Sequence, residues 1–178
     1  MTFNHHVALI VSRCDDVRNR YYDIGYGVRT AGKIPVSVKL GPYFTSLANV
    51  ALQLQRHGVD GLVLFNRFYR FDIDVENLLP KAGNAYSSSD ETAVPLRWIS
   101  LLSYELELDL AASTGIHTAE DALKHLLAGA SVVQLYSTLF LNGFPRLREM
   151  EQEIRDWMEK HRFKNIEDFQ AVCRKDPE

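Results

Sequence analysis

The stretch VSVKLGPYFTSLANVALQLQRHGVDGLVLF, residues 36–65, predicts a strand, a helix and a second strand. Its two ends are short and almost wholly apolar, which is typical of buried strands. Between them lie apolar side chains at helical spacing: Leu47, Val50, Ala51 and Leu54. Gly58 follows where a helix would end. Short apolar strands joined through a helix indicate a parallel sheet whose strands are buried on both faces.

The same order of elements returns nearer the C-terminus. Residues 109–113 and 131–136 have the composition of buried strands, and residues 118–130 between them have the spacing of a helix. A long helix begins near Pro145, with apolar side chains on one face: Leu147, Met150, Ile154 and Trp157. Residues 17–32 predict a further helix that leads into the first strand.

The middle of the chain breaks this alternation. Residues 66–95 form a long stretch that contains the small polar tract SSSDE, and such loops in compact domains are usually functional or mobile. The next segment, residues 94–103, predicts a strand or an ordered extended piece. The sequence has no internal repeat and no clear linker, so a single domain, residues 1–178, is the simpler interpretation.

The composition limits the partners and the location. The chain has 178 residues, 46% of them hydrophobic and 24% charged, which is enough to bury a substantial core. The net charge of −3 is spread along the chain, and no basic stripe indicates nucleic acid. Apolar runs such as VALIV are far shorter than the ~20 residues that span a bilayer. We therefore expect a cytoplasmic protein that binds neither nucleic acid nor membranes.

Cysteine and histidine give no sign of a metal site. Cys14 and Cys173 are too few and too far apart for a disulfide framework or a thiolate metal site, so we expect two free thiols. His5 and His6 are adjacent and close to the N-terminus, which is a poor arrangement for metal ligands. We predict no metal.

Parallel strands joined by helices occur in two common architectures, the open doubly wound sheet and the closed (β/α)8 barrel. The glycine-rich phosphate loops of the open sheet, GxGxxG and GxxxxGK[ST], do not occur in this sequence. Small residues instead follow two successive late strands, in ASTGIHTAEDA and YSTLFLNG. The loops after the seventh and eighth strands of a barrel often present backbone N–H groups to one phosphate in this way. The barrel is therefore the better interpretation.

The length limits how much of a barrel the chain can form. A complete barrel of this type usually takes ~250 residues, whereas this sequence shows only four or five convincing strands. The fold class is therefore α/β, a parallel (β/α) barrel of TIM type. We expect its C-terminal portion, about half to five-eighths of a barrel.

Five segments in order carry a resemblance to one family: IPVSVKLGPYF, GVDGLVLFNRFYRFDID, PLRWISLLS, DLAASTGIHTAEDALKHLLAGASVVQLYSTLFLNG and WMEKHRFKNIEDF. Together they resemble the C-terminal half of the dihydroorotate dehydrogenases, from about residue 17 to residue 169. The resemblance implies an FMN-dependent oxidoreductase on a (β/α)8 barrel. Such an enzyme oxidises a CH–CH bond in a dihydropyrimidine-like ring, a small-molecule substrate.

Lys39 lies near the end of the first predicted strand, where a lysine is unusual. From the sequence alone it is a lysine that reaches solvent from a strand end. The resemblance places it on the family's flavin lysine, at the end of the fifth barrel strand. A cation there stabilises the negative charge that collects near the flavin N1 and C2 carbonyl on reduction. The resemblance therefore implies that Lys39 is both catalytic and cofactor-binding.

Asn66 ends the next strand and matches the family's substrate-binding asparagine. Its amide can donate to and accept from a planar pyrimidine ring. From the sequence alone, an ordinary turn asparagine is the alternative. Arg67 follows where a smaller residue is usual in the pyrimidine-forming enzymes. The charged loop around Arg67 could bind a different acidic substrate, or it could be a solvated loop with no such role.

The resemblance also implies a phosphate site made by three loops. The cofactor-binding residues that it implies, besides Lys39, are Ser103, Thr114, Gly115, Ser137 and Thr138. Tyr104, Thr114 and Tyr136 stand where glycine is expected, so the site is altered. Thr118 and the acids after it predict helix capping whether or not phosphate binds.

Whether this chain alone is an enzyme stays open. The family's proton acceptor is a cysteine or serine on a loop after the fourth strand, in the N-terminal half. Cys14 is the nearest candidate, but it precedes the first predicted helix and nothing nearby favours its thiolate, so an uninvolved thiol is the better interpretation.

Three functions remain in play. The first is the flavin oxidoreductase, completed by another segment or subunit. The second is a truncated, catalytically silent half-barrel that acts through self-association or a partner. The third is a phosphate-binding barrel without flavin. A half-barrel has open sheet edges and apolar surface, so we expect a homo-oligomer or a complementary half-barrel chain as partner.

Overall fold

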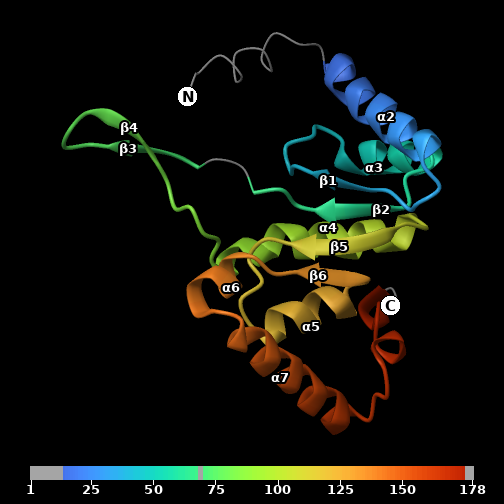
Figure 1. Ribbon diagram of the computed structural model, residues 1–178, viewed down its shortest axis with the longest axis vertical. Helices are drawn as coiled ribbons and strands as arrows, with labels where there is room; N and C mark the ends of the chain where they lie inside the picture. Colours follow the sequence, from blue (N-terminus) through green and yellow to red (C-terminus); the bar gives the residue numbers. More distant parts are fainter. Residues whose placement is uncertain (1–13, 68–69, 175–178) are drawn as a thin grey trace.

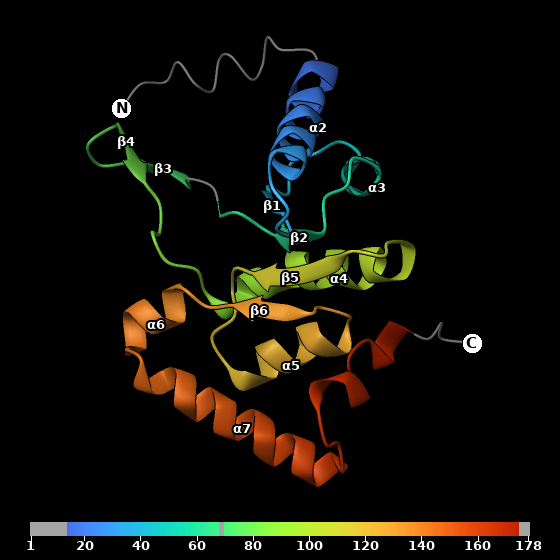
Figure 2. The same ribbon diagram turned by 45° about the vertical axis from the view of Figure 1, so that its right-hand side comes forward.

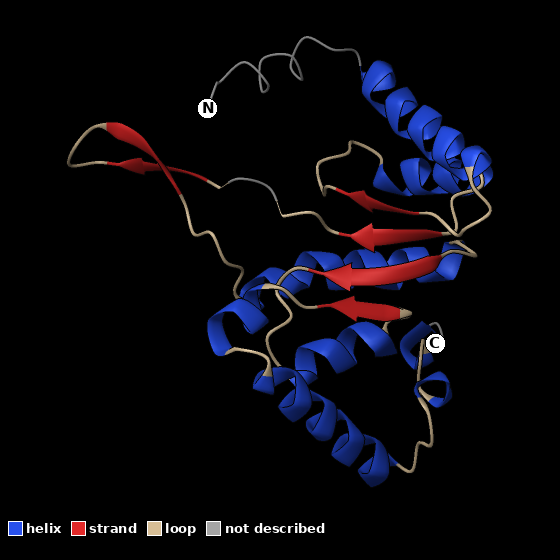
Figure 3. Cartoon of the chain, in the orientation of Figure 1, coloured by secondary structure: helices blue, strands red, loops and turns tan. Residues whose placement is uncertain are grey.

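The computed structural model describes residues 14–67 and 70–174 (Figure 1). The predictions for His5 and His6, and the side chain of Cys14, lie outside the described residues. Within that part, four parallel strands form one sheet in the spatial order β1-β2-β5-β6. They are β1 (Ser37–Leu40), β2 (Gly61–Leu64), β5 (Asp109–Ser113) and β6 (Val132–Gln134), and all four arrows point the same way in Figure 3.

Helices alternate with these strands. The α-helices are α2 (Cys14–Ala31), α3 (Leu47–Arg56), α4 (Ala93–Glu105), α5 (Ala119–Leu127), α6 (Ser137–Asn142) and α7 (Pro145–His161). Short 3-10 helices are η1 (Ser89–Thr92), η2 (Ile166–Asp168) and η3 (Val172–Arg174). Helix α5 lies between β6 and α7 in both ribbon views (Figures 1 and 2). A parallel sheet with alternating helices confirms the fold class, a partial (β/α) barrel of TIM type.

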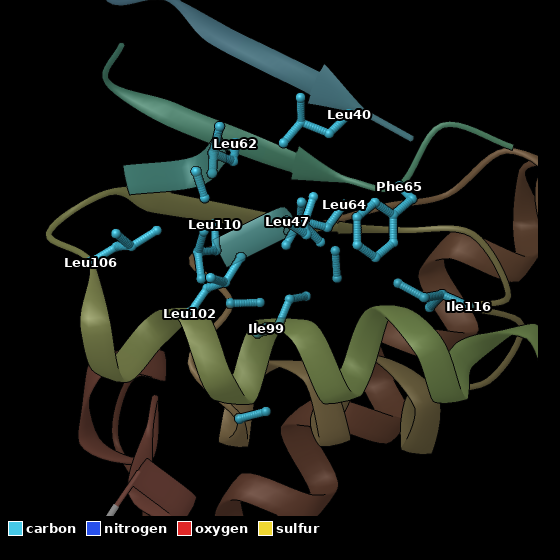
Figure 4. Packing of buried hydrophobic residues seen from close by; sticks show 14 of the residues in the cluster. Leu40, Leu47, Leu62, Leu64, Phe65, Ile99, Leu102, Leu106, Leu110 and Ile116 are labelled. Carbon is cyan, nitrogen blue, oxygen red and sulfur yellow. The ribbon is translucent and has the colours of Figure 1, made fainter. Parts of the chain in front are cut away.

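The core lies between one face of the sheet and the helices. Alternate residues of a strand point to opposite faces, and the register aligns Leu40 with Leu64 and Leu64 with Ala112. Figure 4 shows leucines of β1, β2 and β5 against Ile99 and Leu102 of α4. These side chains are at most 1% exposed, and together they anchor the sheet on its helical layer.

The opposite face of the sheet is only partly covered. Lys39 and Gln134 are exposed on this face, and Val132 is 51% exposed. Strand β2 is buried throughout, as predicted, but the prediction that the strands are buried on both faces is wrong for β1 and β6. These two are the outer strands of the sheet, and each bonds to a single neighbouring strand within the described residues.

Residues 66–95, predicted as a long loop, contain more structure than that. Strands β3 (Phe71–Asp74) and β4 (Leu79–Ala82) form an antiparallel hairpin that projects from the body (Figure 1). The hairpin closes at its base where the Gly83 amide donates to the Arg70 carbonyl at 2.7 Å. No helix in the described part of the chain is both long and apolar enough to cross a membrane.

Two local predictions have opposite outcomes. Thr118 caps α5, because its side chain accepts a hydrogen bond from the Asp121 amide at 3.1 Å, so the capping prediction is confirmed. The prediction of a strand or an ordered extended piece over residues 94–103 is wrong, because these residues lie in α4.

Candidate functional site

Five of the predicted site residues lie around one open pocket at the carboxyl ends of the parallel strands. Lys39, Asn66, Gly115 and Ser137 all line it, together with Thr114, and its volume is about 630 Å³. That volume falls within the roughly 300–1,000 Å³ of small-molecule sites. Because Lys39, Asn66, Gly115 and Ser137 each end or follow a predicted parallel strand, the sequence predicts that they share one end of the sheet. This prediction is confirmed, while their chemical roles stay predictions.

Lys39 points across the less covered face of the sheet. Its ammonium donates to Ser113 Oγ at 3.2 Å and to Gln134 Oε1 at 3.3 Å, on β5 and β6. Within the described residues, Lys39 forms no ion pair with a carboxylate, so its charge is available to a ligand. Ser113 and Gln134 also line the pocket, and the sequence analysis missed both. Alternate residues of parallel strands share one face of the sheet, so Ser113 and Gln134 lie on the same face as Lys39. Polar side chains at these positions are the signal that could have found them.

The turn after β5 has an unusual backbone. Thr114 and Gly115 both have φ of +82°, a region that side chains other than glycine rarely adopt. The Thr114 hydroxyl donates to the Phe65 carbonyl at 3.0 Å and helps to hold the turn. The resemblance implies a glycine pair at these two positions. The backbone has the conformation that glycines favour, although one of the two residues is a threonine.

Residues 84–92, here called the strap, cross the carboxyl ends of β2, β5 and β6. The Ser87 amide donates to Ser137 Oγ at 3.0 Å, and Ser87 Oγ lies 3.1 Å from His117 Nε2. Ser89 Oγ donates to Asp121 Oδ2 at 3.2 Å. Ala85 and Ser87 line the pocket, so the strap is one of its walls.

Asp121 is a buried carboxylate beneath the strap. Burial opposes its ionisation and is the largest influence on its pKa. Hydrogen bonds with the backbone of His117, with the side chain and backbone of Thr118 and with the side chain of Ser89 outweigh it. The pKa of Asp121 is therefore lower than its ordinary value, and the carboxylate stays charged while it fixes the turn before α5.

Ser103 is not part of this site, which corrects its predicted role in a phosphate loop. It lies inside α4, where its hydroxyl donates to the Ala128 carbonyl at 2.9 Å. Its neighbours Asp109 and Ser131 mark the amino ends of β5 and β6, opposite the pocket. Tyr104 is exposed on the same helix.

Thr138 lies beside the pocket, buried in the first turn of α6, with its hydroxyl 3.5 Å from the His117 carbonyl. Within the described residues, no group of three or more His, Cys, Asp or Glu side chains is placed to hold a metal ion. Cys173 is an exposed free thiol.

The pocket lies at the carboxyl ends of parallel strands, the end at which (β/α) barrels carry their sites, and its Lys39 has no carboxylate partner among the described residues. The model of the dihydroorotate dehydrogenase family matches residues 6–158, and the chain belongs to this family. This confirms the resemblance that the sequence segments carried.

Relatives in this family are similar over most of the chain. Dihydroorotate dehydrogenase B (NAD(+)), catalytic subunit, of Thermoplasma volcanium is 29% identical over 156 residues, 86% of this chain and 51% of the relative. The protein of the same name from Pyrococcus furiosus is 28% identical over 157 residues, 86% of this chain and 52% of the relative. That from Methanocaldococcus jannaschii is 32% identical over 136 residues, 75% and 44% of the two chains. The chain spans about half the length of the curated relatives it matches.

Proposed function

We propose that this chain forms the cofactor-binding part of an FMN-dependent oxidoreductase of the dihydroorotate dehydrogenase type. Its reaction is the oxidation of a CH–CH bond in a dihydropyrimidine-like ring. One observation carries the proposal: the Lys39 ammonium, unpaired with any carboxylate in the described residues, shares a pocket with Asn66, Gly115 and Ser137. The family and the similarity to dihydroorotate dehydrogenase catalytic subunits support it.

The residues of the pocket fit FMN. A volume of about 630 Å³ is sufficient for a cofactor of this size. Bound FMN would supply the acceptor for the hydride that leaves the substrate. Lys39 would hold the electron-rich pyrimidine end of the cofactor, oriented by Ser113 and Gln134. The exposed amide of Asn66 would orient a planar substrate, since it both donates and accepts hydrogen bonds.

The described pocket does not include a loop after the fourth barrel strand, on which the resemblance places the proton acceptor. The residues that line it include no cysteine, and its serines, Ser87, Ser113 and Ser137, lie on the strap, β5 and α6 and not on a loop after the fourth barrel strand. We expect another segment or subunit to provide this group, so that oxidation needs more than the residues described.

Replacing Lys39 with methionine tests the flavin role. Because the charge is needed mainly by reduced, anionic flavin, oxidised FMN should bind with a loss of affinity of about threefold or less. The midpoint potential of the bound flavin should fall by about 30 mV, which for two electrons corresponds to about 1.4 kcal/mol. Flavin titration and potentiometry give the two values.

A matched control for this test is Lys124→Met on α5, which removes an exposed lysine paired with Glu120. It should leave both the affinity and the potential unchanged. If the unmodified chain does not bind FMN, even with a complementary half supplied, the flavoenzyme proposal is wrong.

A silent half-barrel that acts through association is the second candidate. The observation that favours it is the less covered face of the sheet, where Val132 of the outer strand β6 is exposed. We expect the chain to form a homodimer or a complex with a complementary chain. Light scattering at several concentrations measures this, and a monodisperse monomer that melts cooperatively would contradict it.

A further inference from the structure

Arg67 lines the pocket directly after Asn66, yet its guanidinium is satisfied within the protein. Nε and Nη2 donate to the two carboxylate oxygens of Glu91 at 3.0 and 3.3 Å. Nη1 donates to the carbonyls of Asn84 and Ala85 at 2.7 and 2.8 Å. Four hydrogen bonds use most of the five N–H donors of arginine. Arg67 is therefore a structural partner of the strap, and an acidic substrate would have to displace these bonds to reach it.

Glu91 is the second half of this arrangement. It also pairs with Arg70 at 2.7 Å and accepts from the Ser88 amide at 3.1 Å. Burial opposes its ionisation and is the largest influence on its pKa, but the hydrogen bond from Arg67 and the positive charges of Arg67 and Arg70 keep that pKa below its ordinary value. The side chains of Arg67 and Glu91 are only 19% and 13% exposed, so solvent screens their attraction less than that of surface pairs.

These contacts tie together three parts of the pocket. Arg67 fixes the segment that follows β2 and carries Asn66, and Glu91 fixes the strap. The strap in turn reaches Ser137 through the Ser87 amide. The backbone of residues 91 and 92 lies against Gly115, so closely that an added Cβ would be 2.5 Å from the Thr92 nitrogen. A change at the ion pair is therefore transmitted to the loops after β5 and β6.

We propose that Arg67 and Glu91 form a latch that holds the strap in place as a wall of the cofactor pocket. Both are positioning residues, and they act on the ligand through Ala85, Ser87 and Asn66. The identity of the ligand, FMN, rests on the proposed function. The latch also leaves Lys39 as the cation of the pocket that has no carboxylate partner among the described residues.

A double-mutant cycle tests the latch. Glu91→Gln and Arg67→Met should each weaken FMN binding by about tenfold. Because each variant breaks the same pair, Arg67→Met/Glu91→Gln together should weaken it by little more than the worse single change. Titration of FMN by quenching of its fluorescence measures the affinity. Glu153→Gln on α7 is the matched control, since it breaks the 2.8 Å pair with Arg146, outside the lining of the pocket.

Limited proteolysis tests the latch without flavin. Tyr86 of the strap is half-buried and stacks on Phe140 with ring centroids 4.6 Å apart. Chymotrypsin should cleave after Tyr86 about tenfold faster in Glu91→Gln than in the unmodified chain. Cleavage after Trp157, near the C-terminal end of α7, should keep its rate and so report that the fold is intact.

The outcomes separate the two proposals. If Glu91→Gln is cleaved after Tyr86 no faster than Glu153→Gln, the latch is wrong. Equal acceleration at Tyr86 and Trp157 would also overturn it, because the pair would then support the whole fold and not the strap. If the unmodified chain fails to bind FMN but Glu91→Gln still frees Tyr86, the flavin proposal fails and the latch stands.

Discussion

Replacing Gly115 with valine is expected to lower the free energy of unfolding by about 3–5 kcal/mol. The backbone at Gly115 has φ of +82°, which a β-branched side chain adopts only under strain. An added Cβ would also lie 2.5 Å from the Thr92 nitrogen and 2.8 Å from the Glu91 carbonyl carbon. Both atoms belong to the backbone and cannot move without displacing the strap.

Gly143→Val separates the strain from the clash. Gly143 has φ of +77°, but an added Cβ there would meet only the Pro145 Cδ, at 3.5 Å. It should cost about 1–3 kcal/mol, the strain alone. Urea unfolding of both variants measures the difference. If Gly115→Val is no less stable than Gly143→Val, the strap does not pack on Gly115 as closely as the structure indicates.

Gly115 therefore has a structural role besides its predicted role in cofactor binding. The resemblance implies that Gly115 is a cofactor-binding residue of a phosphate loop, and it does line the pocket. Its nearest neighbours outside the turn, however, belong to the strap. A loss of FMN binding in a Gly115 variant would therefore report displacement of the strap as well as obstruction of a phosphate.

It could be predicted that the site residues lie together, because this follows from the topology of the sheet. Lys39, Asn66, Gly115 and Ser137 each end or follow a parallel strand, and parallel strands bring such residues to one edge. Helix α4 was missed although its signal was readable. Its buried residues Pro95, Ile99 and Leu102 recur at helical spacing, and proline is tolerated in the first turn of a helix. Because α4 was predicted as a strand, Ser103 was expected in a phosphate loop after it. Ser103 instead lies near the amino ends of β5 and β6, opposite the pocket.

The strap could not be predicted from local sequence. Its contacts join residues far apart in the chain, 24 positions for Arg67 and Glu91 and 50 for Ser87 and Ser137. The tract SSSDE has the composition of a solvated loop, and its residue types do not indicate which distant residues bond to it. Specific pairs of this kind become visible only when the sheet has brought the loops together.

Below pH 6.5 the protein should lose stability through His125, and His125→Leu should remove most of that loss. His125 is fully buried in α5, with Nδ1 2.7 Å from the Asp121 carbonyl. Its Nε2 has no hydrogen-bond partner within the described residues. Burial lowers the pKa of His125 below its ordinary value, although the carbonyl and the charge of Asp121 oppose this. The native state therefore keeps the ring neutral.

The direction of the effect follows from proton binding. Histidine in the unfolded chain takes up its proton near pH 6.5, whereas the native state takes it up only at lower pH. Between those values the unfolded state binds more protons, so stability falls as the pH is lowered, by up to about 1.4 kcal/mol per pH unit. The carboxylates of Asp121 and Glu91 have lowered pKa values, and their stabilisation is lost only as the pH falls below about 4, the value for unfolded carboxylates.

Urea unfolding at pH 7.5 and pH 5.5 therefore isolates the histidine. The unmodified chain should be about 1 kcal/mol less stable at pH 5.5, and His125→Leu should show little change between the two values. His161→Gln, which alters an exposed histidine of α7, should behave like the unmodified chain. An equal loss of stability in His125→Leu would mean that another group titrates in this range, because leucine has no proton to gain.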